Sequence, residues 1–137
     1  MTAGMTDLGA MLRTLTVTRR PETYTFITLD TDAPALGDGV EAVISEAEGP
    51  TVVATLQRAL AEGWPIGFTA TWLTLDIHSA LEAVGLTATV ARALTRAAIP
   101  CNVIAAYHHD HLLVPADRAD EAILVLEGVA SEPDRSD

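Results

Sequence analysis

The chain has 137 residues, of which 49% are hydrophobic and 4% aromatic, and it carries a formal net charge of −11. This length favours one folded unit, whose core must come from aliphatic side chains because aromatic ones are scarce. The basic residues, eight in all, form no cluster larger than Arg19–Arg20, and this disfavours nucleic acid and anionic membrane surfaces as partners.

Cysteine content and apolar runs bear on the cellular compartment. Cys101 is the single cysteine, so no intrachain disulfide can form. The first residues lack the basic start and the apolar stretch of a signal peptide. No apolar run approaches the ~20 residues that span a bilayer. Together these features predict a cytoplasmic protein in a reducing environment.

Residues 1–65 read as a β-rich segment that packs into the same unit as the rest of the chain. Strands rich in β-branched residues are expected at residues 24–29, 41–47 and 51–56. Residues 57–63 resemble one or two helical turns that end at Gly63, and a single helix over 51–63 is the alternative.

Residues 66–130 have the clearer pattern. Strands are expected at 66–77, 101–107 and 112–114, with helices after residue 85 and after residue 116. Alternation along the first of these strands puts Leu73 and Leu75 on one face and Trp72 on the other. The four residues 108–111 are short enough to be a hairpin turn.

This half therefore reads β-α-β-β-α, a ferredoxin-like order that lacks its final strand. Residues 1–65 must supply further strands. The expected class is α+β, with a mostly antiparallel sheet and helices on one face. Residues 131–137 are polar, and we expect a disordered tail there.

Three stretches resemble the ACT domain, and most closely a bacterial family of small, free-standing ACT-like proteins. They are SEAEGPTVV (45–53), SALEAVGLTATVARAL (79–94) and IPCNVIAAYHHDHLLVPADRADEAILVL (99–126). The resemblance implies a regulatory module, not an enzyme, that binds an amino acid or a similar small carboxylate without any cofactor. It also implies a homodimer. No enzyme is attached within these residues, so any regulated protein target is unidentified.

In ACT domains the ligand lies beside the loop between the first strand and the first helix, which corresponds here to Asp76–Thr87. Gly85 would let the backbone approach a ligand, and the helix beginning near Leu86 would point free N–H groups at a carboxylate. The alternative is an ordinary turn glycine. The full set of expected ligand-binding residues is Asp76, His78, Ser79, Leu81, Gly85, Leu86, Thr87, His108 and His111, with no catalytic residue and no metal ligand.

All four histidines lie between residues 78 and 111. In a ferredoxin-like order, the end of the first strand and the hairpin 108–111 lie at one edge of the sheet. We therefore expect a histidine rim beside the loop, which tunes ligand charge or binds a metal weakly. The alternatives are exposed turn residues without a shared role, a small metal-dependent enzyme that uses the His108–His111 hairpin, or a purely protein-interacting module.

Overall fold

The computed structural model describes residues 10, 12–77 and 85–131. The strands are β1 (Thr16–Thr28), β2 (Val40–Ile44), β3 (Thr51–Thr55), β4 (Phe68–Asp76), β5 (Asn102–Ala105) and β6 (Asp110–Pro115). The helices are α2 (Leu56–Glu62), α3 (Leu86–Arg96) and α4 (Ala119–Ser131), with a 3₁₀ turn η2 (Ala116–Arg118) before α4. The tail beyond residue 131 lies outside the described residues.

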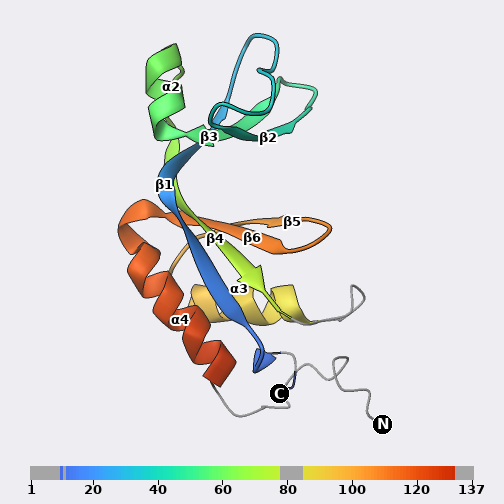
Figure 1. Cartoon of the computed structure of the whole chain (residues 1–137), viewed down its shortest axis with the longest axis vertical. Helices are drawn as coiled ribbons and strands as arrows, with labels where there is room; N and C mark the ends of the chain where they lie inside the picture. The colour runs from blue at the N-terminus through green and yellow to red at the C-terminus, as the bar shows by residue number, and fades with distance from the viewer. Residues whose placement is uncertain (1–9, 11, 78–84, 132–137) are drawn as a thin grey trace.

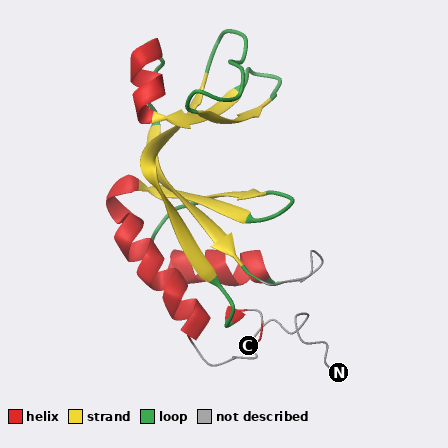
Figure 2. Ribbon diagram, viewed as in Figure 1, coloured by secondary structure: helices red, strands yellow, loops and turns green. Residues whose placement is uncertain are grey.

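The strands form one six-stranded sheet in the order β2-β3-β1-β4-β6-β5. Every neighbouring pair is antiparallel. Figure 1 shows the hairpins β2–β3 and β5–β6 extending to the same side of the long β1–β4 pair, so the sheet is curled. The expected α+β class and antiparallel sheet are confirmed, and the ribbon view separates the strand layer from α3 and α4 (Figure 2).

Strand β1 completes the sheet beside β4. From β4 onward the chain order is β4, α3, β5, β6 and α4. The edge of β4 that β6 leaves open pairs with β1, from Thr16 opposite Asp76 to Phe26 opposite Phe68. Residues 1–65 thus supply the strand that the sequence required. The expected strand 24–29 covers only the second half of β1, which begins at Thr16.

Residues 51–63 divide into a strand and a helix, so the alternative of one continuous helix was wrong. Thr55 ends β3 and caps α2, since its side-chain oxygen accepts a hydrogen bond from the Arg58 N–H at 3.1 Å. Gly63 ends α2 with a left-handed φ of 71°, a conformation that glycine adopts at low cost.

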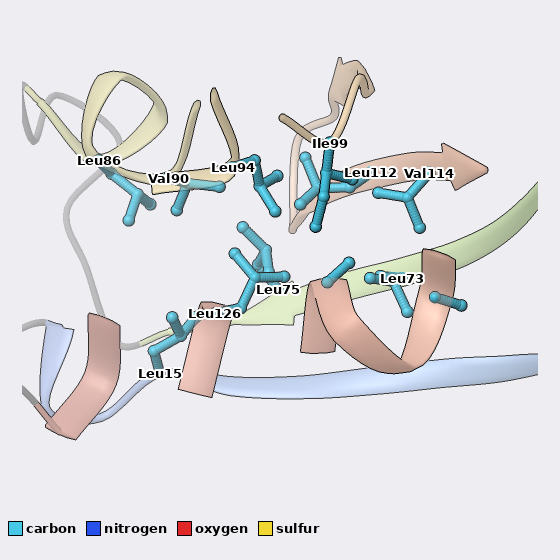
Figure 3. Close-up of a cluster of buried hydrophobic side chains, with 12 residues drawn as sticks. Leu15, Leu73, Leu75, Leu86, Val90, Leu94, Ile99, Leu112, Val114 and Leu126 are labelled. Carbon is cyan, nitrogen blue, oxygen red and sulfur yellow. The ribbon is translucent and has the colours of Figure 1, made fainter. Parts of the chain in front are cut away.

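The outer face of the sheet carries the largest buried cluster. Leu73 and Leu75 of β4, with Leu112 and Val114 of β6, meet side chains from both long helices (Figure 3). The helical members include Leu86, Val90, Leu94, Ala119, Ala122 and Leu126. Their spacing gives α3 and α4 one apolar stripe each, and both helices pack on this face.

The inner face of the curled sheet carries a second cluster. Because side chains alternate along a strand, Ala70 and Trp72 point away from Leu73 and the helices. They pack with Tyr24 of β1, Val53 of β3 and Leu113 of β6. Among the described residues, no helix combines the length and apolar character needed to cross a membrane.

Candidate functional site

The expected ligand loop begins at Asp76, the last residue of β4, and ends at the start of α3. The side chain of Asp76 is 62% exposed. Gly85 has a φ of 102°, and α3 starts after it without a side-chain hydrogen bond to its first turn. Leu86 is buried in the outer cluster and Thr87 is exposed. His78, Ser79 and Leu81 lie outside the described residues.

The three described histidines lie near one another at the end of the β5–β6 hairpin. Ring centroids are 6.5 Å apart for His108 and His109, and 6.3 Å apart for His109 and His111. His109 Nδ1 lies 4.0 Å from Asp76 Oδ1. The end of β4 and this hairpin are therefore neighbours, as the strand order predicted. No group of three His, Cys, Asp or Glu side chains in the described ranges is arranged to hold a metal ion.

His111 differs from the turn residue that the sequence suggested. It belongs to β6, where it pairs with Thr74 on one side and Ile104 on the other. Alternation with the buried Leu112 places it on the inner face. The expected turn 108–111 was thus too long, because β6 begins at Asp110.

Two hydrogen bonds define the protonation state of His111. Its Nδ1 lies 3.1 Å from Trp72 Nε1 and 3.0 Å from the Thr74 hydroxyl. An indole N–H can only donate, so Nδ1 accepts and the neutral ring carries its proton on Nε2. Burial lowers the pKa of His111, and the positive charge of Arg20 and the neighbouring His109 lower it further. The inner face therefore favours an uncharged imidazole.

Trp72 also lies beneath a guanidinium that the sequence reasoning missed. Arg20 Cζ is 4.0 Å from the Trp72 ring centroid. Arg20 Nη1 donates to Glu41 Oε1 at 2.7 Å and to the Tyr24 hydroxyl at 3.3 Å. The Tyr24 and Trp72 rings are 5.3 Å apart. We call Arg20, Tyr24, Glu41, Trp72 and His111 the inner-face cluster.

Irregular strand register brings the two charged members of this cluster together. In the β1–β4 pair the register shifts between Arg19 and Thr23, a stretch of β1 that contains Pro21. In the β2–β3 pair it shifts between Val40 and Ala42, which leaves Glu41 extra. Such bulges re-aim side chains and are enriched beside functional sites. The signal in the sequence was a proline inside a strand, since proline is found there mainly at edges and bulges.

Comparisons with known proteins address both halves of the chain. Two family models described as ACT domain match it, one over residues 3–71 and the other over residues 68–128. No match was found among curated proteins.

Solved structures agree with this fold. A Vibrio cholerae protein of unknown function, described as a possible transport protein, is 33% identical, with 94% of this chain and 100% of that chain covered and a TM-score of 0.80. An Agrobacterium tumefaciens protein is 17% identical, with 79% and 81% covered and a TM-score of 0.56, and this likeness concerns the fold alone.

Proposed function

Because this chain belongs to the ACT-domain family, we propose that it is a regulatory module that senses a small ligand and does not catalyse a reaction. ACT domains are ferredoxin-like and generally bind small molecules. The ligand that fits best is an amino acid or a related small carboxylate. The observation that supports it most is the start of α3 within residues 68–128, where no side chain caps the first helical turn.

This geometry suits a carboxylate for physical reasons. The first N–H groups of a helix lack partners within the helix, and the helix dipole adds positive potential there. Gly85 adopts a left-handed φ that favours glycine over other residues. Because glycine has no side chain, the backbone at this position can approach a ligand closely. Asp76 is exposed enough to meet the amino group of the same ligand.

The proposed binding residues are those that the sequence suggested. They comprise Asp76, His78, Ser79, Leu81, Gly85, Leu86, Thr87, His108 and His111. Leu86 would contribute its backbone N–H, because its side chain packs in the outer cluster. The histidines would set the charge of the rim beside Asp76, from which His109 is 4.0 Å away.

A thermal-shift screen against the twenty amino acids and their deaminated analogues tests this function. A ligand present at 100 times its Kd stabilises the folded state by about 2.7 kcal/mol. Calorimetry on two variants then tests the loop. We expect Gly85→Val to abolish binding, since valine does not tolerate this φ. Asp76→Ala should weaken the binding of amino acids more than the binding of their deaminated analogues.

Asp117→Ala, which removes an exposed acid in η2, is the matched control for Asp76→Ala. Melting without ligand shows whether Gly85→Val still folds. If Asp76→Ala and a folded Gly85→Val bind like the parent, the loop is not the site. If none of the amino acids or analogues raises the melting temperature, the proposed ligand class is wrong.

A further inference from the structure

Arg20 has an unused hydrogen-bonding edge. A guanidinium carries five N–H donors, and both hydrogens of Nη1 are directed to Tyr24 and Glu41. No hydrogen bond joins its Nε or Nη2 to any residue in the part of the chain that the structure describes. By contrast, Nε of Arg58 donates to Glu62 at 3.0 Å and Nε of Arg118 donates to Glu121 at 2.8 Å. Among the described residues, Arg20 is thus anchored through Nη1, while its Nε and Nη2 make no hydrogen bond.

The plane of this guanidinium is fixed from below. It stacks on Trp72 at 4.0 Å, and Trp72 is itself only 4% exposed. The indole is held by its hydrogen bond to His111 Nδ1 and by its contact with the Tyr24 ring. A stacked and anchored guanidinium has little freedom left to lose, which lowers the entropic cost of binding a planar partner.

The two charged side chains of the cluster are partly exposed to solvent. The side chains of Arg20 and Glu41 are 32% and 37% exposed, in contrast to the buried aromatic residues beneath them. They lie on the inner face of the sheet, whose two hairpins project to the same side in Figure 1. α3 packs against the outer face through Leu86, Val90 and Leu94, whereas Arg20 stacks on Trp72 at the inner face. The two proposed sites are therefore centred on opposite faces of the sheet, and His111 is the residue that they share.

We propose that the inner-face cluster is a second ligand site, which binds a small amino carboxylate through the free edge of Arg20. The Nε and Nη2 donors match the two oxygens of a carboxylate and would form two parallel hydrogen bonds. Glu41 Oε1 accepts from Arg20. Oε2 has no hydrogen-bond partner among the residues that the structure describes, so it could accept from an ammonium group of the ligand. A phosphate dianion is disfavoured, because Glu41 repels a second negative charge.

This inference shares its ligand class with the proposed function but not its location. The chain has two tryptophans, Trp64 and Trp72, so a Trp64→Phe background lets Trp72 fluorescence report on the inner face. The probes are the twenty amino acids, acetate, ethylamine and inorganic phosphate. We expect at least one amino acid to change this fluorescence saturably, and to bind more tightly than acetate or ethylamine.

Variants at Arg20 supply the decisive comparison. Arg20→Gln should lower the affinity for the amino acid about tenfold or more, because a charge-assisted bidentate pair of hydrogen bonds is lost. Arg20→Lys keeps the charge but not the planar fork, and it should also bind weakly. Glu41→Gln should weaken the binding of the amino acid but not that of acetate, which has no ammonium group. The control is Arg19→Gln, which removes the adjacent positive charge, paired in the parent with Asp120 of α4, and should bind like the parent.

Several outcomes would overturn the proposal. They are no saturable response to any amino acid, a stronger response to phosphate than to amino acids, unchanged binding in both Arg20 variants, or equal losses in Arg19→Gln and Arg20→Gln. Arg20→Lys keeps the test valid if Arg20→Gln fails to fold. Binding lost in Gly85→Val but kept in both Arg20 variants would leave the proposed function standing and remove this second site. The reverse pattern would support the inner-face site and remove the loop.

Discussion

His111 connects the protonation state of the inner face to the stability of the fold. The ring is neutral because Trp72 donates to Nδ1, and because burial, Arg20 and His109 disfavour a second positive charge there. Asp110 acts in the opposite direction but does not reverse the shift. Protonation of Nδ1 would break the hydrogen bond to Trp72 and place a cation next to Arg20.

This arrangement predicts a dependence of stability on pH. Since the pKa of His111 lies below its ordinary value of 6.5 in the folded state, the unfolded chain binds more protons in the window between the two values. The contribution of neutral His111 to the free energy of unfolding is therefore fully present above about pH 6.5, and it is lost as the pH falls toward the folded-state pKa.

We expect His111→Gln to reduce this loss of stability in acid, measured as the free energy of unfolding in urea between about pH 5 and 8. His108→Gln is the control, because the His108 ring contacts the exposed Tyr107 and not the buried Trp72. An identical pH profile for the parent and His111→Gln would contradict the assignment.

Helix α4 depends on its apolar stripe. Leu126 is fully buried in the outer cluster, whereas Leu124 on the same helix is 69% exposed. We expect Leu126→Ala to cost about 2–5 kcal/mol, because it removes packing and leaves a cavity. Leu124→Ala should change the free energy of unfolding by less than about 0.5 kcal/mol. Chemical denaturation of the two variants checks this, and equal losses would show that the stripe is misassigned.

Helix α2 is short and depends on its cap. The Thr55 hydroxyl oxygen accepts from the Arg58 N–H, so Thr55→Ala should cost about 0.5–2 kcal/mol. Thr55→Ser retains the oxygen and should stay close to the parent. Unfolding curves of both variants in urea measure the difference. A loss in Thr55→Ser equal to that in Thr55→Ala would mean that the methyl group matters and the cap does not.

Elements with strong periodicity could be predicted from the sequence, and irregular ones could not. The stripe of Leu86, Val90 and Leu94 located α3, and alternation placed Leu73 and Trp72 on opposite faces. The first half of β1 was missed because Arg20 and Pro21 sit in a bulge, where period-two alternation fails.

The inner-face cluster was missed for a related reason. Its members come from four strands, and Arg20 meets Glu41 only because two separate bulges occur in β1 and β2. The spacing of residues in the sequence does not predict this contact between Arg20 and Glu41. The rim was easier to predict, because strand order alone brings Asp76 close to His109.

Assembly concerns the molecule as a whole. β1 pairs with the edge of β4, so β2 and β5 are the outermost strands of the sheet. β5 exposes Val103, and an exposed edge strand invites pairing with another chain. We therefore propose that the protein is a homodimer, a state common among ACT domains.

Light scattering at high micromolar concentration should give about twice the 14.4 kDa chain mass. Val103→Lys places a charge on the edge and should shift the equilibrium toward monomers if β5 is the interface. Ile44→Lys places a charge on β2 and tests in the same way whether that edge is the interface. A parent protein that stays at 14.4 kDa would contradict the homodimer.

The position of β1 has a consequence for how the molecule folds. β1 pairs with both β3 and β4, and its pairing with β4 joins residues as distant in sequence as Thr16 and Asp76. Such non-local contacts raise the contact order and slow folding, because a long loop must close before the contacts form. β1 belongs to the part matched over residues 3–71, yet it pairs with β4 of the part matched over residues 68–128. Excising the second part would therefore leave one edge of β4 without its partner strand.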